Sequence, residues 1–287
     1  MRSLLLTIVM GCVFSVTGAD IAEEIQAWET ETGGLPRNPQ ERVVEAPDGM
    51  SLVLLIGQSN MAGRADIPKE DRKPLARALK LNRDDEWVPA TAPFHFDRRT
   101  AGIGPANAFV KRYLAEHPKE TVGIVPCAVG GSRSATWDAH GTGKVGANFR
   151  RALKRAQVAK GKGRFVAILW HQGESDAGAT AEELKSHYPR RFADMIAAFR
   201  QEIGDVPVVV GEIGRFLPEA AAKVNPVLAA LPKSVPNCRC VSSEGLTNRD
   251  KWHFDLKSAN ELGDRYYAAF RELSDLKGCR PLPQGKE

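Results

Sequence analysis

An apolar run that ends abruptly at a glycine, with a serine two residues later, constrains this chain most. Residues 52–56 read Leu-Val-Leu-Leu-Ile, and Gly57-Gln-Ser59 follows directly. A continuous apolar run of this length predicts a strand buried on both faces, as strands are in a parallel sheet. Ser59 then lies at the carboxyl edge of that sheet, where open α/β folds bind their ligands. Asn60 and Gly63 suit the start of a helix or loop whose backbone N–H groups can face an oxyanion.

Four further predicted strands follow the first, and helical patterns separate them. The strands are 122–129, 164–170, 206–210 and 238–242. Helical patterns cover 105–116, 147–159, 181–202, 218–231 and 257–273. Such alternation predicts an α/β fold, a three-layer α/β/α sandwich with a five-stranded parallel sheet. The charged, proline-containing segment 64–99 predicts an insertion loop near Ser59.

The N-terminus has the pattern of a secretory signal peptide. Arg2 precedes the apolar run 4–16, and Thr-Gly-Ala at 17–19 supplies the small residues of a cleavage site. The run is too short to span a bilayer comfortably. A lipoprotein signal ending at Cys12 is disfavoured because the apolar run continues past that cysteine. We therefore expect an exported protein, periplasmic or secreted, with no stable membrane association after cleavage near Ala19.

Charge and cysteine content exclude some classes of partner. The 287 residues carry 40 Lys and Arg against 35 Asp and Glu, a net charge of +5 that is spread along the chain. This pattern disfavours a nucleic-acid partner. After export, Cys127, Cys238, Cys240 and Cys279 remain, and a disulfide from Cys238 or Cys240 to Cys279 is one possible pairing. A metal site is disfavoured because these cysteines lack CxxC spacing and no His cluster accompanies them.

An activated serine needs a base, a group that orients the base, and hydrogen-bond donors for the oxyanion. His253 stands in Asp250-Lys-Trp-His-Phe, where a carboxylate three residues earlier can reach the ring Nδ1 and leave Nε2 for the serine. A structural Asp–His pair that caps the last helix is the alternative. The Gly130-Gly131 turn offers unobstructed backbone N–H groups, and Gln172 offers a side-chain donor. For each motif taken alone, an ordinary polar turn is the competing interpretation.

Four motifs in order carry a resemblance to a known family. They are Gly57-Gln-Ser-Asn-Met-Ala-Gly63, Pro126-Cys-Ala-Val-Gly-Gly131, Trp170-His-Gln-Gly-Glu-Ser-Asp176 and Asp250-Lys-Trp-His-Phe254. Together they resemble the flavodoxin-like SGNH-hydrolase superfamily, and within it the sialate O-acetylesterase-like group that includes the acetylxylan esterases of carbohydrate esterase family six. The resemblance covers roughly residues 52–270. With the N-terminal pattern, this predicts a signal peptide (1–19), an N-terminal arm (20–49), an esterase domain (50–275) and a C-terminal tail (276–287).

The resemblance implies a catalytic role for four of the residues. Ser59 matches the nucleophile and His253 the base. Asp250 matches the acid of the family's DxxH motif. Glu174 is a competing acid, since members of this group also place a carboxylate near the His from the Gln-Gly-Glu turn.

The resemblance also implies the oxyanion donors and suggests a pocket. The donors are the Ser59 N–H, the Gly131 N–H with Gly130 as the register alternative, and the Gln172 side chain. The residues after the glycine turn are candidates for lining the acyl or sugar pocket. They are Arg133, Trp137 and His140.

The function that these residues imply is removal of O-acetyl groups from a carbohydrate through an acetyl-enzyme on Ser59. The expected partner is an acetylated xylan or an O-acetylated sialic acid, and no metal or organic cofactor is expected. The alternatives are a broad short-chain esterase or acetyltransferase with the same machinery, and a non-catalytic carbohydrate-binding protein on an esterase fold.

Overall fold

A computed structural model describes residues 41–278 of the chain. The predicted signal peptide, most of the predicted N-terminal arm and Cys279 lie outside the described residues. Cys127, Cys238 and Cys240 are free thiols within them. None of the helices between residues 41 and 278 combines the length and the apolar character that crossing a membrane requires.

The described chain forms a seven-stranded sheet rather than the five-stranded sheet expected from the sequence. Its order is β3-β2-β4-β1-β5-β6-β7, and only the β2–β3 pair is antiparallel. The five predicted strands are confirmed. They are β1 (Met50–Gly57), β4 (Val122–Pro126), β5 (Gly163–His171), β6 (Val208–Gly211) and β7 (Cys238–Val241).

The two additional strands correct the prediction of an insertion loop at 64–99. β2 (Ala78–Leu81) pairs in parallel with β4, and β3 (Trp87–Pro89) forms the edge of the sheet. Lys80 lies inside β2, is buried, and pairs with Glu41 at 3.2 Å. A lysine in the middle of a four-residue strand breaks the apolar pattern by which a buried strand is identified.

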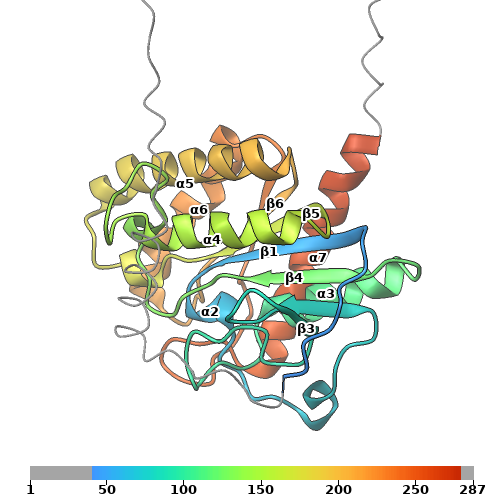
Figure 1. The fold of residues 1–287 in the computed structure, drawn as a ribbon. Coiled ribbons are helices and arrows are strands. Elements are labelled where there is room, and N and C mark those ends of the chain that lie inside the picture. The colour runs from blue at the N-terminus through green and yellow to red at the C-terminus, as the bar shows by residue number, and fades with distance from the viewer. Residues whose placement is uncertain (1–40, 279–287) are drawn as a thin grey trace, which may run out of the picture.

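Helices cover both faces of the sheet (Figure 1). α4 (Ala147–Lys160), α5 (Ala181–Ile203) and α6 (Pro218–Ser234) lie on one face, and α3 (Pro105–Glu116) and α7 (Leu256–Gly278) lie on the other. The three-layer α/β/α arrangement is therefore confirmed.

β1 lies at the centre of the sheet and contributes to both apolar cores. Its side chains alternate, so that Leu52, Leu54 and Ile56 pack into one core cluster while Val53 and Leu55 pack into the other. All five are fully buried. Burial on both faces explains why the strand is a continuous apolar run, and it fixes the residues that follow the strand at the carboxyl edge.

Candidate active site

Ser59 follows β1 across a turn that only glycine can make. Gly57 has a φ of +128°, and a Cβ at this position would lie 2.1 Å from the carbonyl oxygen of His171. The Gln58 N–H donates to that same oxygen at 2.8 Å. Ser59 then begins the short helix α2 (Ser59–Ala62). The first N–H groups of a helix have no partner within it, so the Ser59 N–H is available at the carboxyl edge.

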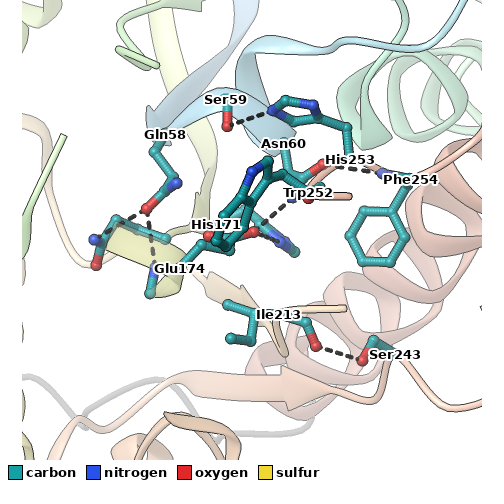
Figure 2. Close-up of polar contacts among 12 residues, drawn as sticks. Gln58, Ser59, Asn60, His171, Glu174, Ile213, Ser243, Trp252, His253 and Phe254 are labelled. Carbon is teal, nitrogen blue, oxygen red and sulfur yellow. Dashed lines mark hydrogen bonds and ion pairs between the residues drawn. The ribbon is translucent and has the colours of Figure 1, made fainter. Parts of the chain in front are cut away.

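The structure brings Ser59, His253 and Asp250 into one hydrogen-bonded chain. Ser59 Oγ lies 3.1 Å from Nε2 of His253, and Figure 2 shows the two side chains pointing toward each other. Nδ1 of His253 lies 2.9 and 3.0 Å from the two carboxylate oxygens of Asp250. This is the geometry of a nucleophile, a base and an orienting acid.

Asp250 is held in the form that a triad acid needs. Its Oδ1 accepts backbone N–H groups from Trp252 at 2.8 Å and His253 at 3.0 Å. Partial burial opposes ionisation, but the hydrogen bonds from the His253 ring and these backbone groups outweigh it and lower the pKa of Asp250. The carboxylate is therefore negative near neutral pH and faces the ring nitrogen that carries the proton.

Glu174, the competing acid, contacts other residues. It lies in the 3₁₀ helix η3 (Glu174–Asp176), where its Oε1 accepts from Asn60 Nδ2 at 2.6 Å and lies 3.6 Å from Nε2 of His171. Burial favours the neutral acid, yet the contacts with His171 and Asn60 outweigh burial and lower the pKa of Glu174. Of the two acids, only Asp250 has a hydrogen bond with His253 among the described residues.

Asn60 connects the nucleophile to the loop that carries the base, a role the sequence reading missed. Its Nδ2 donates to the carbonyl oxygen of Trp252 at 3.1 Å, and its Oδ1 accepts the Phe254 N–H at 3.2 Å. The residue after Ser59 therefore binds the backbone on both sides of His253, and Figure 2 shows the bond to Phe254. Glu174 accepts the remaining proton of the Asn60 amide.

The glycine turn after β4 offers one free backbone donor. The Gly130 N–H donates to Asp97 Oδ2 at 2.8 Å, and Asp97 forms a buried ion pair with Arg64 at 2.6 Å. The Gly130 N–H is therefore not available to an oxyanion. Gly131 has a φ of +80° and lines the cleft, and none of the described residues accepts its N–H. Of the two registers considered for the glycine donor, the structure favours Gly131.

The structure contradicts the expectation that Gln172 donates to the oxyanion. Gln172 is fully buried and does not line the cleft. Its Nε2 donates to Ser132 O at 3.1 Å, to Gln58 Oε1 at 3.2 Å and to Asp176 Oδ2. An amide nitrogen has two protons, and three protein acceptors already share them.

The three residues expected to line the acyl or sugar pocket do not line it. Trp137 is buried in the core, where its ring packs edge-on against Trp170 and its Nε1 donates to Ser132 Oγ at 3.2 Å. His140 is exposed and lies 3.6 Å from Asp194. Arg133 is exposed as well, and it is not among the residues of the cleft.

The catalytic groups open into a cleft of about 850 Å³. Its walls include residues from three segments that the sequence reading did not single out as pocket residues. They are Gln58, Arg98, Arg249 and Trp252. Trp252 is 45% exposed, which is unusual for so large an apolar side chain. The position of Trp252 next to His253 in the sequence could have identified it as a residue of the cleft.

No group of three or more His, Cys, Asp and Glu side chains between residues 41 and 278 is arranged to hold a metal ion. His171 and Glu174, which lie 3.6 Å apart, are buried against Tyr266 and Asn60.

Comparisons with known proteins point to one family of esterases. Residues 49–272 match the model of a family described as carbohydrate esterase, sialic acid-specific acetylesterase. The chain is 28% identical over 239 residues to a probable carbohydrate esterase of Arabidopsis thaliana, covering 74% of this chain and 86% of that protein.

Solved structures show the same fold. The X-ray structure of that Arabidopsis thaliana protein has a TM-score of 0.67 and 26% identity, over 79% of this chain and 99% of the other. A carbohydrate acetylesterase from Xanthomonas citri, 22% identical, has a TM-score of 0.59 over 78% of this chain and 57% of the other. Because the family model covers most of the chain, this protein belongs to the carbohydrate esterase, sialic acid-specific acetylesterase family.

Proposed function

We propose that this protein removes O-acetyl groups from a carbohydrate through an acetyl-enzyme on Ser59. The observation that carries the proposal is the Ser59–His253–Asp250 hydrogen-bond chain, which opens into the cleft. Membership of the family supports carbohydrate esterase activity. The hydrogen-bond chain supports a serine mechanism for that activity.

In the first half-reaction, Nε2 of His253 accepts the proton of Ser59 Oγ as that oxygen attacks the acetyl carbon. A C–O bond forms, and the carbonyl electron pair moves onto the oxygen. The tetrahedral intermediate collapses, and the bond to the sugar oxygen breaks. His253 then gives its proton to the departing alcohol. Asp250 stabilises the transient imidazolium and holds the ring in the tautomer that presents a free Nε2.

In the second half-reaction, water replaces the sugar alcohol. His253 accepts a proton from the water as its oxygen attacks the acetyl-enzyme, and the second intermediate expels Ser59 Oγ, which regains its proton. The product is acetate. In both half-reactions the Ser59 and Gly131 N–H groups, which line the cleft, stabilise the oxyanion. Loss of one such donor costs about 10²–10³ in kcat.

The walls of the cleft favour a sugar as the alcohol component. A volume of about 850 Å³ is in the range of small-molecule sites and exceeds what an acetyl group needs. The exposed ring of Trp252 offers an apolar face on which the C–H groups of a sugar can pack.

Charge in the cleft favours an acidic sugar over a neutral one. The Arg98 guanidinium lines the cleft and contacts the carbonyl oxygen of Gly130 at 3.3 Å. None of the described residues forms an ion pair with it. A cation beside the glycine turn can bind a sugar carboxylate by two hydrogen bonds. O-acetylated sialic acid is therefore our preferred substrate, with acetylated xylan as the neutral alternative.

The test is acetate release from an aryl acetate, acetylated xylan and O-acetylated sialic acid, with wild type beside Ser59→Ala. We expect the highest kcat/KM with the acidic sugar and no release by Ser59→Ala. Release from the aryl ester alone would leave a short-chain esterase. Undiminished release by Ser59→Ala, or none by folded wild type, would contradict the mechanism.

Export after cleavage near Ala19 is part of the same proposal. It rests on the charged, apolar and small-residue pattern of residues 1–19. N-terminal sequencing of protein recovered from outside the cytoplasm tests it, and a mature chain that begins at Met1 would contradict it.

A further inference from the structure

Asp97 and Arg98, near the end of the charged segment 64–99, both contact the glycine turn after β4. The Gly130 N–H donates to Asp97 Oδ2 at 2.8 Å, and Arg98 Nη2 donates to the Gly130 carbonyl oxygen at 3.3 Å. Two neighbouring side chains therefore hold both polar groups of the Gly130 backbone. Neither residue belongs to the four sequence motifs, which assign them no task.

The glycine turn has the geometry of a type II β-turn. The Ser132 N–H donates to Val129 O at 3.2 Å, so Gly130 and Gly131 are the two central residues. Gly131 has a φ of +80°, the value of the second central residue in a type II turn. Rotation of the central peptide gives a type I turn, in which that residue has a φ of about −90°. Glycine adopts both signs of φ readily, so the Gly-Gly sequence alone does not fix this peptide.

The central peptide carries the Gly130 carbonyl oxygen at one end and the Gly131 N–H at the other. Because a trans peptide is planar, these two groups point in opposite directions. While the oxygen accepts from Arg98, the Gly131 N–H is directed away from the guanidinium. The flipped peptide would bring that N–H against the guanidinium, which has donors only. Arg98 therefore favours one of the two orientations that the glycines allow.

Asp97 anchors the start of the turn and is itself held by a buried ion pair. Arg64 Nη2 lies 2.6 Å from Asp97 Oδ2, and the two side chains are 6% and 2% exposed. A Cβ at Gly130 would lie 2.9 Å from that carboxylate oxygen, so the glycine packs directly on the ion pair. Arg64 Nη1 also donates to the carbonyl oxygen of Gly63, which ends α2. The ion pair therefore links the helix that begins with Ser59 to the glycine turn.

We propose that Arg98 is a positioning residue, which directs the Gly131 N–H toward the oxyanion by holding the Gly130 carbonyl oxygen. Asp97 anchors the turn on which it acts. The contact uses one of the five N–H groups of the guanidinium, so others remain for a substrate carboxylate. No proton is transferred. This inference rests on the proposed function, because it requires the oxyanion that attack by Ser59 creates.

Arg98→Met is the first variant, because it removes the guanidinium and keeps an unbranched side chain. Arg98 is exposed, so its loss leaves no buried charge. Asp97 is unsuitable for substitution, since its removal would leave the buried Arg64 without its counter-ion. Arg99→Met, at the neighbouring exposed arginine, is the matched control for the loss of one positive charge.

Gly131→Ala is the second variant, because it acts on the same peptide by another route. A side chain disfavours a φ of +80°. A Cβ at this position has room, since the nearest atom beyond the neighbouring residues is Arg98 Nη2 at 3.7 Å. Alanine therefore favours the flipped peptide without a steric clash. The double variant, Arg98→Met with Gly131→Ala, tests whether the two changes act on the same N–H.

Steady-state hydrolysis of a neutral aryl acetate measures this effect apart from any binding of a carboxylate. Gly131→Ala should lower kcat by about 10²–10³, the cost of one oxyanion donor. Arg98→Met should lower kcat by about 10–100-fold, because the released peptide still samples the active orientation. KM should stay nearly unchanged in both. The double variant should match Gly131→Ala within about threefold, since an N–H can be lost only once.

Losses of kcat that do not multiply, in variants that thermal unfolding shows to be folded, support the assignment when Arg99→Met keeps wild-type kcat. Wild-type kcat in either folded single variant overturns it. So do losses that multiply in the double variant, because independent effects multiply, and a loss in Arg99→Met equal to that in Arg98→Met. Failure of the proposed function has a different signature, since Ser59→Ala would then retain acetate release whatever the other variants do.

Discussion

Asn60→Ala removes the side chain that ties the nucleophile to the base. The variant loses hydrogen bonds to Trp252 O, to the Phe254 N–H and to Glu174. Asn60 is 4% exposed, so these groups lose their hydrogen-bond partner at a site that is almost inaccessible to solvent. Each buried polar group left unsatisfied costs about 1–3 kcal/mol. Because water can enter part of the space, we expect a loss of roughly 3 kcal/mol in the free energy of unfolding.

The same substitution should slow the reaction through His253. The two bonds that Asn60 makes to residues 252 and 254 hold the ring 3.1 Å from Ser59 Oγ. A displacement of about 1 Å at a reacting group can cost roughly 10²-fold in rate. We therefore expect kcat to fall about 100-fold, with a smaller change in KM.

Urea unfolding and steady-state hydrolysis of an aryl acetate measure the two effects separately. Asn225→Ala is the control, because Asn225 is a buried asparagine whose side chain bonds the Ile213 N–H and carbonyl oxygen at 2.9 and 3.1 Å, away from the 252–254 loop. We expect it to lose stability and to keep kcat. A folded Asn60→Ala variant that keeps wild-type kcat would refute the idea that this side chain positions the base.

Three further predictions concern the acids and a buried histidine. Asp250→Asn should lower kcat by about 10²–10⁴, because an amide leaves His253 in the wrong tautomer. Glu174→Gln should lower kcat less, since Glu174 contacts Asn60 and not His253. Equal losses of kcat in the two variants would contradict the assignment of Asp250 as the acid. Because the pKa of Glu174 is lowered from 4.5, its carboxylate stabilises the fold fully above about pH 4.5. This stability is lost as the pH falls through the lowered pKa. Urea unfolding of Glu174→Gln should therefore depend less on pH in that acid range. Burial lowers the pKa of His95 from 6.5 to about 3. As the pH falls from 6.5 towards 3, the free energy of unfolding should therefore fall by up to about 1.4 kcal/mol per pH unit. His95→Leu should lose this dependence on pH.

The sequence predicted the fold where burial imposes a pattern. β1, β4, β6 and β5 beyond its first two residues are buried, and their sequences are largely apolar. β7 is the exception, because Arg239 and Cys240 in it are only half-buried. β2 and β3 were missed for a physical reason. They are four and three residues long, and β2 contains Lys80, whose charge is satisfied by Glu41 across the chain. A tertiary ion pair of this kind leaves no local signal.

The sequence predicted which catalytic residues meet better than it predicted the direction in which other side chains of the site point. The spacing of Asp250 and His253 correctly indicated a contact, because a turn of three residues brings the carboxylate back to the ring. Gln172 and Trp137 were misjudged because a motif does not state which way a side chain leaves the backbone. Both point into buried surroundings. Asn60 bonds a loop almost 200 residues away, a contact that only the assembled fold creates.

Trapping the acetyl-enzyme tests the proposed serine mechanism most directly. Wild type and Ser59→Ala are mixed with an excess of an activated acetyl ester, quenched in acid within the first turnover, and digested for peptide mass spectrometry. We predict one acetyl group on the peptide that contains Ser59 in wild type, located on the serine oxygen, and none in the variant. Acetate release at the wild-type rate without acetylation of Ser59, or with an acetyl group on another side chain, would contradict it.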